Sequence, residues 1–411
     1  MIISTSLVAD VGLRFVPPAR MAHRSWEAAF VFPRIGPFAP NMVYDNDRAY
    51  GDLPAMANLP SLRVYRREHF TTDAFGFRNT PSAQNRPIRM IVVGDSFAAG
   101  AGLSDSETLS AQLARMGQTG VYNGGATYSW SAAERLIRRL QFKGGLVIWQ
   151  ISERFDAPPE VGADVKFEDR VLSSLLPPDS TGYEIMRTAF RLARGFYKYS
   201  PLRIVMTRMF SVFEDGRWLP NASAGNVVLA QVGNGRQMGF FSAEFEKFGK
   251  KRPTPPDYFV GLQAAVRATG NEMMVLMVPD KLNVYYPLVE GFAQPGEYST
   301  LNVLAQNLRK NGVPALDLTP VFRQQAADAL RNGQYLYWLD DTHWSPLGVR
   351  IAAGEILKFL RESGIQQRVD LTTAGHSNSP PLKPPPPPKT PSAIGVAPLP
   401  RLKTPSNTLV P

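Results

Sequence analysis

Residues 88–97 read Ile-Arg-Met-Ile-Val-Val-Gly-Asp-Ser-Phe, and this stretch decides the fold. Residues 88–93 are almost entirely apolar, which is typical of a strand buried on both faces of a parallel sheet. The spacing of Ser104 and Glu107 matches a capping box and predicts a helix soon after the strand. The stretch therefore indicates one strand–loop–helix unit of an α/β protein, with Ser96 at the carboxyl end of the strand.

Apolar runs and amphipathic segments keep alternating further along the chain. Strands are predicted at residues 120–122, 146–151, 273–278 and 314–318. Helices are predicted at about residues 109–116, 131–140, 259–268, 300–310 and 347–360, where apolar side chains recur at helical spacing. Strands and helices that alternate in this way predict a three-layer α/β/α fold around a doubly wound, flavodoxin-like parallel sheet.

Three parts of the chain depart from this pattern. Residues 1–84 are expected to form an irregular N-terminal segment, followed by the α/β domain at residues 85–371. That domain is interrupted at about residues 157–256 by a largely helical insertion. Residues 372–411 are rich in proline, with an unbroken run at 384–388, and are predicted to be a disordered tail.

The chain carries a formal net charge of +10, but the excess of basic residues is local. It is concentrated in the tail and in residues 185–213, and no nucleic-acid-binding motif accompanies it. We therefore expect no nucleic-acid partner. Within residues 185–213, basic side chains at helical spacing predict either a solvated lid helix or a contact with an anionic membrane surface. They are Arg187, Arg191, Arg194 and Lys198.

Cysteine is absent, which excludes disulfides, thiolate zinc sites and a cysteine nucleophile. Residues 1–9 are apolar, but they lack a basic segment in front and fall short of the ~20 residues that span a bilayer. The sequence as given therefore predicts neither a signal peptide nor a complete transmembrane helix. An ordinary N-terminal segment and the end of a membrane anchor both fit residues 1–9.

Ser96 is the candidate nucleophile. In an open α/β sheet, ligands bind at the carboxyl edge of the strands, which is where Ser96 lies. A serine in this position exposes its hydroxyl, and its own backbone N–H can donate to a developing oxyanion. A Gly-Asp-Ser triplet alone is a weak signal, but the strand before it and the predicted helix after it strengthen the hypothesis.

His343 is the candidate base. Of the four histidines, His23 and His69 fall in the N-terminal segment and His376 in the tail, whereas His343 precedes a predicted helix of the α/β domain. Asp340 and Asp341 come shortly before it, and either can orient the imidazole. A surface histidine with ordinary acidic neighbours is the alternative. These groups lack further metal ligands nearby, so neither a metal nor another cofactor is predicted.

Three blocks of the sequence resemble the SGNH (GDSL) hydrolases. Residues 94–102 are similar to the first block, and Asn123-Gly124-Gly125 to the second. Residues 341–344, Asp-Thr-His-Trp, resemble the last block in the form used by the SGNH-like alginate O-acetyltransferases. Two shorter stretches, residues 153–154 and 278–285, resemble the same group, and residues 72–79 fit the wider family.

The resemblance implies a serine-dependent O-acetyltransferase or esterase that acts on a carbohydrate or cell-envelope polysaccharide. It implies that Ser96 is the nucleophile and that the N–H groups of Ser96 and Gly125 form the oxyanion hole. The asparagine that completes this hole in many relatives is missing after the third strand, where Arg154 is the candidate replacement. A salt bridge to Glu153 or Asp156 is the other role considered for Arg154.

Further substrate contacts are expected from Asn123, Lys281 and Trp344. A structural or surface lysine and a core tryptophan are the alternatives for the last two. The resemblance also implies a place in the cell envelope or periplasm and a membrane acyltransferase as the acetyl donor. A non-catalytic, SGNH-like protein that binds glycan or scaffolds an assembly is the alternative function.

Overall fold

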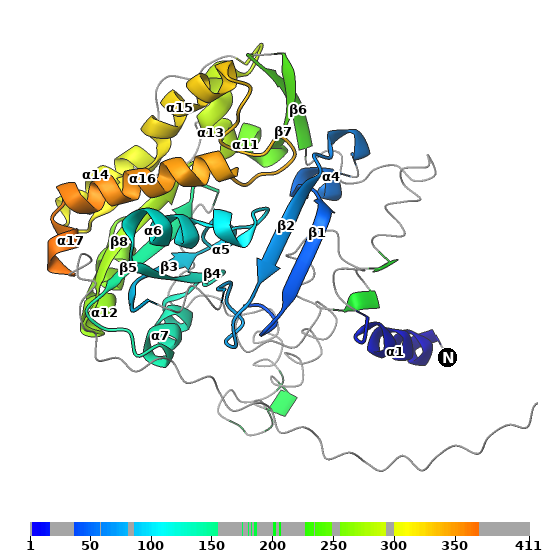
Figure 1. The fold of residues 1–411 in the computed structure, drawn as a ribbon, viewed down its shortest axis with the longest axis horizontal. Coiled ribbons are helices and arrows are strands. Elements are labelled where there is room, and N and C mark those ends of the chain that lie inside the picture. The colour runs from blue at the N-terminus through cyan, green and yellow to red at the C-terminus, as the bar shows by residue number, and fades with distance from the viewer. Residues whose placement is uncertain are drawn as a thin grey trace, which may run out of the picture. The chain divides into compact units, whose positions relative to one another are not determined.

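The computed structural model describes residues 2–16, 37–57, 59–80, 86–154, 227–233, 235–248, 255–292 and 300–369, with isolated positions between 175 and 206 (Figure 1). All of them belong to one compact unit, Met1–Ser379. Several expectations concern residues outside this description: His23, Asp156, Arg187, Arg191, Arg194, Lys198, His376 and the tail at 372–411. Among the described residues, no helix has the length and apolar character needed to cross a membrane.

A parallel sheet forms the centre of the described structure. Its five strands are β3 (Ile88–Gly94), β4 (Gly120–Gly125), β5 (Leu146–Ser152), β8 (Glu272–Val278) and β9 (Ala315–Asp317), in the spatial order β4-β3-β5-β8-β9. Every neighbouring pair is parallel. This order is the 2-1-3-4-5 arrangement of flavodoxin-like sheets, so the predicted doubly wound α/β fold is confirmed.

Helices cover both faces of the sheet. Met90 and Val92 pack into one apolar core, whereas Ile91 and Val93 pack into the other, which explains the unbroken apolar run of β3. One layer contains α6 (Leu109–Gly117), α15 (Thr319–Arg331) and α16 (Pro346–Glu362), and the opposite layer contains α7 (Trp130–Arg139), α12 (Asp257–Ala268) and α14 (Thr300–Lys310). The short helices α13 (Lys281–Tyr285), η5 (Tyr286–Leu288) and α17 (Ile365–Arg368) complete this part of the chain.

The segment after β3 differs in detail from the prediction. Ser104 and Glu107 do form a capping box, but it encloses only the 3-10 turn η3 (Asp105–Glu107). Helix α6 has its own N-cap, because the side chain of Thr108 accepts a hydrogen bond from the N–H of Ala111. The predicted helix is therefore present, and it begins one short turn later than the motif indicates.

The N-terminal segment contains more regular structure than expected. Its described residues form α1 (Ile2–Leu13), β1 (Val43–Ala49), α4 (Asp52–Met56), η1 (Pro60–Leu62) and β2 (Arg66–Thr71), and β1 pairs with β2 in an antiparallel ribbon. Within the expected insertion, the continuous described stretches form the hairpin β6 (Val227–Val232) and β7 (Arg236–Phe241) and the helix α11 (Ser242–Lys247), so a hairpin that the sequence did not predict lies in this part of the chain. Both ribbons bury side chains against other parts of the chain, such as Phe70 and Phe240, and local periodicity does not reveal such contacts.

Gly94 allows β3 to end tightly beside β5. Its φ is +148°, and a Cβ atom there would lie 2.4 Å from Oε1 and 2.6 Å from the carbonyl oxygen of Gln150. The Gln150 Oε1 atom accepts a hydrogen bond from the N–H of Asp95 at 3.1 Å. Glycine at position 94 therefore brings the residues before Ser96 into contact with the neighbouring strand.

We predict that Gly94→Ala lowers the free energy of unfolding by at least about 2 kcal/mol, since a strained backbone conformation and an overpacked methyl group each cost on the order of 1–3 kcal/mol. Chemical denaturation measures the change. The matched control is Gly261→Ala in α12, where a Cβ meets no atom within 4 Å and the substitution should stabilise by up to about 1 kcal/mol. Equal stability of the two variants would contradict the packing described for β3.

Candidate active site

Ser96 lies at the carboxyl end of β3, as the first residue of the short helix α5 (Ser96–Ala99). The helix begins here because Asp95 is its N-cap and accepts a hydrogen bond from the N–H of Phe97 at 2.8 Å. Gly100, in a left-handed conformation, ends it after one turn. Ser96 is only partly buried. It follows β3 at the carboxyl edge of the sheet, and the strand order reverses next to β3, between β3 and β5.

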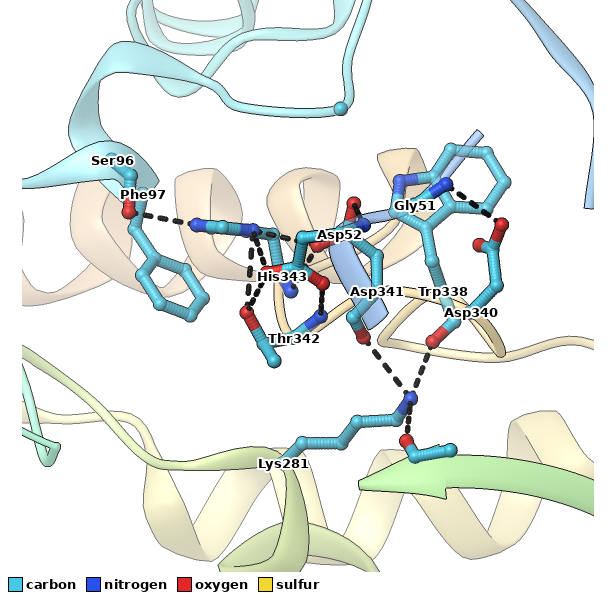
Figure 2. Close-up of polar contacts among 12 residues, drawn as sticks. Gly51, Asp52, Ser96, Phe97, Lys281, Trp338, Asp340, Asp341, Thr342 and His343 are labelled. Atoms are coloured by element: carbon cyan, nitrogen blue, oxygen red, sulfur yellow. Dashed lines mark hydrogen bonds and ion pairs between the residues drawn. The ribbon is translucent and has the colours of Figure 1, made fainter. Parts of the chain in front are cut away.

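Ser96, His343 and Asp341 form a hydrogen-bonded series (Figure 2). His343 Nε2 lies 2.7 Å from Ser96 Oγ, and His343 Nδ1 lies 2.7 Å from Asp341 Oδ1. With the Nδ1–H group hydrogen-bonded to the carboxylate, Nε2 carries no proton and can accept the proton of the serine hydroxyl. The arrangement can therefore activate Ser96 as a nucleophile.

Asp341, and not Asp340, contacts the imidazole. Burial alone would raise the pKa of the Asp341 carboxyl, but the charges of His343 and Arg66 outweigh it and lower that pKa below its ordinary value. Asp341 consequently stays ionised and holds the imidazole in the tautomer that a base requires. The two carboxylates that the sequence left as alternatives thus have different surroundings.

Asp340 joins the catalytic loop, the segment that carries Asp341 and His343, to the N-terminal segment. Its Oδ2 accepts hydrogen bonds from the N–H groups of Gly51 (2.8 Å) and Val64 (2.9 Å), and its Oδ1 accepts one from Arg66 Nη1 at 2.8 Å. Arg66 also donates to Asp341 Oδ2 at 3.1 Å and so bridges both carboxylates. Arg66 and the two backbone N–H groups satisfy the hydrogen-bonding capacity of Asp340, which is fully buried. Asp340 therefore has a structural role.

Lys281 supports the same loop from the other side. Its side chain is fully buried, and Nζ donates to the carbonyl oxygens of Gly239, Trp338, Leu339 and Asp341 at 2.6–3.2 Å (Figure 2). Burial lowers the pKa of Lys281 to about 8, although nearby acids, with Glu244 foremost, oppose the shift. The expectation that Lys281 contacts substrate is therefore wrong, because all three of its protons are used to hold the loop.

Phe97 packs against the imidazole of His343, and Trp344 packs against Phe97. Phe97 lies 4.9 Å from the ring of His343 and 5.4 Å from that of Trp344, measured between centroids. Trp344 is fully buried, so it cannot stack on a sugar, and the alternative of a core tryptophan holds. The aromatic side chains therefore limit the tilt of the histidine ring.

The predicted oxyanion donors are only partly in place. The N–H of Gly125 donates to Asn123 Oδ1 at 2.9 Å, and Asn123 is itself buried, so neither residue faces substrate as expected. Gly125 is required for packing, since a Cβ there would lie 2.2 Å from the nitrogen of Ala99 in α5. Within the described part of the chain, the N–H of Ser96 is left without an acceptor at the start of α5 and can serve as a donor.

Arg154 does not occupy the oxyanion position in this arrangement either. Its two Nη atoms donate to Oγ1 and the carbonyl oxygen of Thr342 at 3.1 and 3.2 Å, and its Nε lies 3.6 Å from Asp280 Oδ1. The guanidinium also lies 5.2 Å from the centroid of Phe97. Arg154 therefore fixes the residue before His343, and its observed ion-pair partner is Asp280, which the sequence did not suggest.

Asp52 is a site residue that the sequence did not predict. Its two carboxylate oxygens accept hydrogen bonds from the N–H of Thr342 at 2.9 Å and from Thr342 Oγ1 at 2.6 Å, and Oδ2 lies 3.7 Å from His343 Nδ1. It is the acidic residue in the first turn of α4, a position that the helix dipole favours, and this is the one local signal it carries. That signal says nothing of a contact with a loop far along the chain.

Asp52, Asp341 and His343 are also the group that could hold a cation, since one ligand atom of each lies within 4.8 Å of the others. The carboxylate oxygens of Asp52 and Asp341 already accept hydrogen bonds from Thr342, from Arg66 and from the imidazole N–H of His343. The donor set therefore suits proton transfer, and we assign no metal to it.

We predict that Asp341→Asn slows the reaction of Ser96 with an activated ester by about 10⁴-fold, the loss known for this change in a well-studied Ser-His-Asp triad. The amide leaves the contact in place but favours the wrong imidazole tautomer. Asp340→Asn is the matched comparison and should cost stability while changing the rate by less than about tenfold, since Asp340 contacts no reacting atom. Stopped-flow kinetics and thermal unfolding of both variants make the measurement. Similar rate losses in the two variants would contradict the assignment of Asp341.

A family model supports the resemblance drawn from the sequence. The SGNH hydrolase-like domain of the acetyltransferase AlgX matches residues 244–380, which include β8, the loop with Asp341 and His343, and α16. Ser96 lies before the matched residues. No curated protein matches the chain. Residues 244–380 are therefore similar to an SGNH hydrolase-like domain, and the five-stranded sheet with the helical layers described above fits that fold.

Proposed function

We propose that the protein is a serine-dependent O-acyltransferase or esterase that carries an acyl group, most simply acetyl, on Ser96. The observation that carries the proposal is the continuous series Ser96 Oγ–His343 Nε2 and His343 Nδ1–Asp341 Oδ1, with 2.7 Å at each step. A serine hydroxyl that is hydrogen-bonded to an oriented histidine is the arrangement used for nucleophilic acyl transfer.

The first half of the reaction forms the acyl-enzyme. His343 takes the proton of Ser96 as Oγ attacks the ester carbonyl, and the tetrahedral intermediate places its negative oxygen against the N–H of Ser96. His343 then gives the proton to the departing alcohol as the ester bond breaks. Asp341 stabilises the imidazolium in between.

The second half determines whether the protein is a transferase or an esterase. Water releases acetate from Ser96, whereas a sugar hydroxyl accepts the acetyl group and gives an O-acetylated carbohydrate. In both cases His343 takes the proton of the attacking oxygen and returns it to Ser96 Oγ as the acyl–oxygen bond breaks. The acetyltransferase named by the matching family supports the transfer route. We further propose a polysaccharide of the cell envelope as acceptor, with a membrane acyltransferase as the source of the acyl group.

A non-catalytic, glycan-binding role remains the second candidate. The observation in its favour is the N–H of Gly125, which is bonded to Asn123 Oδ1 and so is not available to an oxyanion in this arrangement. Losing one oxyanion donor raises the barrier by roughly 2.7–4 kcal/mol in a well-studied protease. A protein of this kind would keep the fold and bind sugar without forming an acyl-enzyme.

We predict that an activated acetate ester acetylates the protein once, at Ser96, and that oligosaccharides accelerate the release of the acetyl group and become acetylated. Intact-protein mass spectrometry and product analysis measure the two steps. Ser96→Ala should abolish the adduct, and the rate in His343→Gln should fall by at least about 10³-fold, because the alcohol loses its base. Turnover in Ser96→Ala equal to that of the wild type would exclude the mechanism. A wild type that forms no adduct would favour the glycan-binding alternative.

A further inference from the structure

We propose that Asp52 is a positioning residue for His343, a second carboxylate that the N-terminal segment supplies to the Ser96–His343–Asp341 series. The inference rests on the proposed function, since it concerns the proton that His343 carries during acyl transfer. It assigns a role to a segment outside the residues that resemble the SGNH hydrolases.

The contacts of Asp52 all lead to the catalytic loop. One carboxylate oxygen accepts the N–H of Thr342 at 2.9 Å, the other accepts its hydroxyl at 2.6 Å, and the latter also lies 3.7 Å from His343 Nδ1. The backbone N–H of Asp52 donates to Asp341 Oδ2 at 3.2 Å. Asp52 therefore fixes the backbone on one side of His343 and adds negative charge beside the ring nitrogen that already faces Asp341 (Figure 2).

The residues flanking Asp52 hold it in place. The N–H of Gly51 donates to Asp340 Oδ2 at 2.8 Å, and the N–H of Leu53 donates to the carbonyl oxygen of Asp340 at 3.3 Å. A Cβ at Gly51 would lie 1.8 Å from that carbonyl oxygen, so the close approach requires glycine. Asp52 is thus docked from both sides and is not a surface acid that happens to point at the loop.

The charged groups around Asp52 set when it is ionised. Burial and the neighbouring Asp341 carboxylate raise its pKa, while His343 and the hydrogen bond from Thr342 oppose the shift. The cations Arg154 and Lys281 also interact with it electrostatically, and Arg66 acts on Asp341. Because the pKa of Asp341 is lowered instead, Asp52 is the first of the two acids to gain a proton as the pH falls.

This ordering gives Asp52 a function that Asp341 alone does not provide. While Asp52 is ionised, its charge stabilises the imidazolium that forms when Ser96 is deprotonated, and charges at such a separation interact strongly in a partly buried site. When Asp52 is protonated, that contribution is lost, but its contacts with Thr342 remain possible for a neutral side chain. Charge and geometry can therefore be separated by experiment.

The test compares Asp52→Asn with Asp47→Asn, an exposed aspartate of β1 outside the site. For Asp52→Asn we expect kcat/KM with an activated acetate ester to fall by about tenfold or more, mainly through kcat, which corresponds to roughly 1.4 kcal/mol of barrier. The deficit should shrink towards acidic pH, where wild-type Asp52 is also neutral. Asp47→Asn should match the wild type at every pH. Asp52→Glu keeps the charge and should show the wild-type pH dependence of kcat/KM. It serves as the second arm of the test if Asp52→Asn does not fold.

A second readout does not depend on turnover. The proton between His343 Nδ1 and Asp341 Oδ1, whose NMR signal is identified by its absence in His343→Gln, should resonate at a different frequency in Asp52→Asn than in the wild type, because Asp52 Oδ2 lies 3.7 Å from the same nitrogen. A rate deficit that is the same at every pH, or an unchanged proton signal, would overturn the proposal and leave Asp52 a purely structural residue. If the wild type forms no acyl-enzyme, the proposed function fails, and the proton signal still decides the role of Asp52.

Discussion

The hydrogen bond between His343 Nδ1 and Asp341 Oδ1, 2.7 Å long and buried, is the constraint on which the rest of the site depends. A carboxylate removed from water is tolerated only when hydrogen-bond donors surround it. Asp341 accepts hydrogen bonds from the imidazole, from Arg66 and from two backbone N–H groups. The neighbouring Asp340 needs the same compensation. Much of the polar structure around the catalytic loop can be understood as the means of keeping Asp341 ionised and both acids in place.

Three segments that are distant in sequence provide this support. Arg66 and Asp52 come from the N-terminal segment, Arg154 from the end of β5, and Lys281 from the start of α13. The sheet brings Ser96 to the same place, so that a serine and a histidine 247 positions apart come within hydrogen-bonding distance. The switch point of the parallel sheet supplies the location, and the buried cations supply the rigidity. Proton transfer from Ser96 depends on both.

The sequence predicted what local pattern controls and missed what long-range polar contacts control. The apolar run of β3 and the Gly-Asp-Ser triplet identified the fold and the position of Ser96, because burial on both faces leaves a direct trace in composition. The roles of Lys281, Trp344 and Arg154 stayed open in the sequence, since a lysine, an indole ring or a guanidinium looks the same there whether it faces substrate or core. Asp52 was missed because its partner lies far along the chain: Asp52 and Thr342 are 290 positions apart. No local signal encodes such a pairing.

The central claim is that His343 makes Ser96 a nucleophile, and covalent labelling tests it most directly. The whole protein would be treated with a fluorophosphonate, digested, and mapped by mass spectrometry, with His343→Gln treated in parallel. The account predicts a single adduct on Ser96 of the wild type and a strongly reduced adduct in the variant, because only a serine with an adjacent base reacts readily. No adduct, an adduct on another serine, or equal labelling of the wild type and His343→Gln would contradict it.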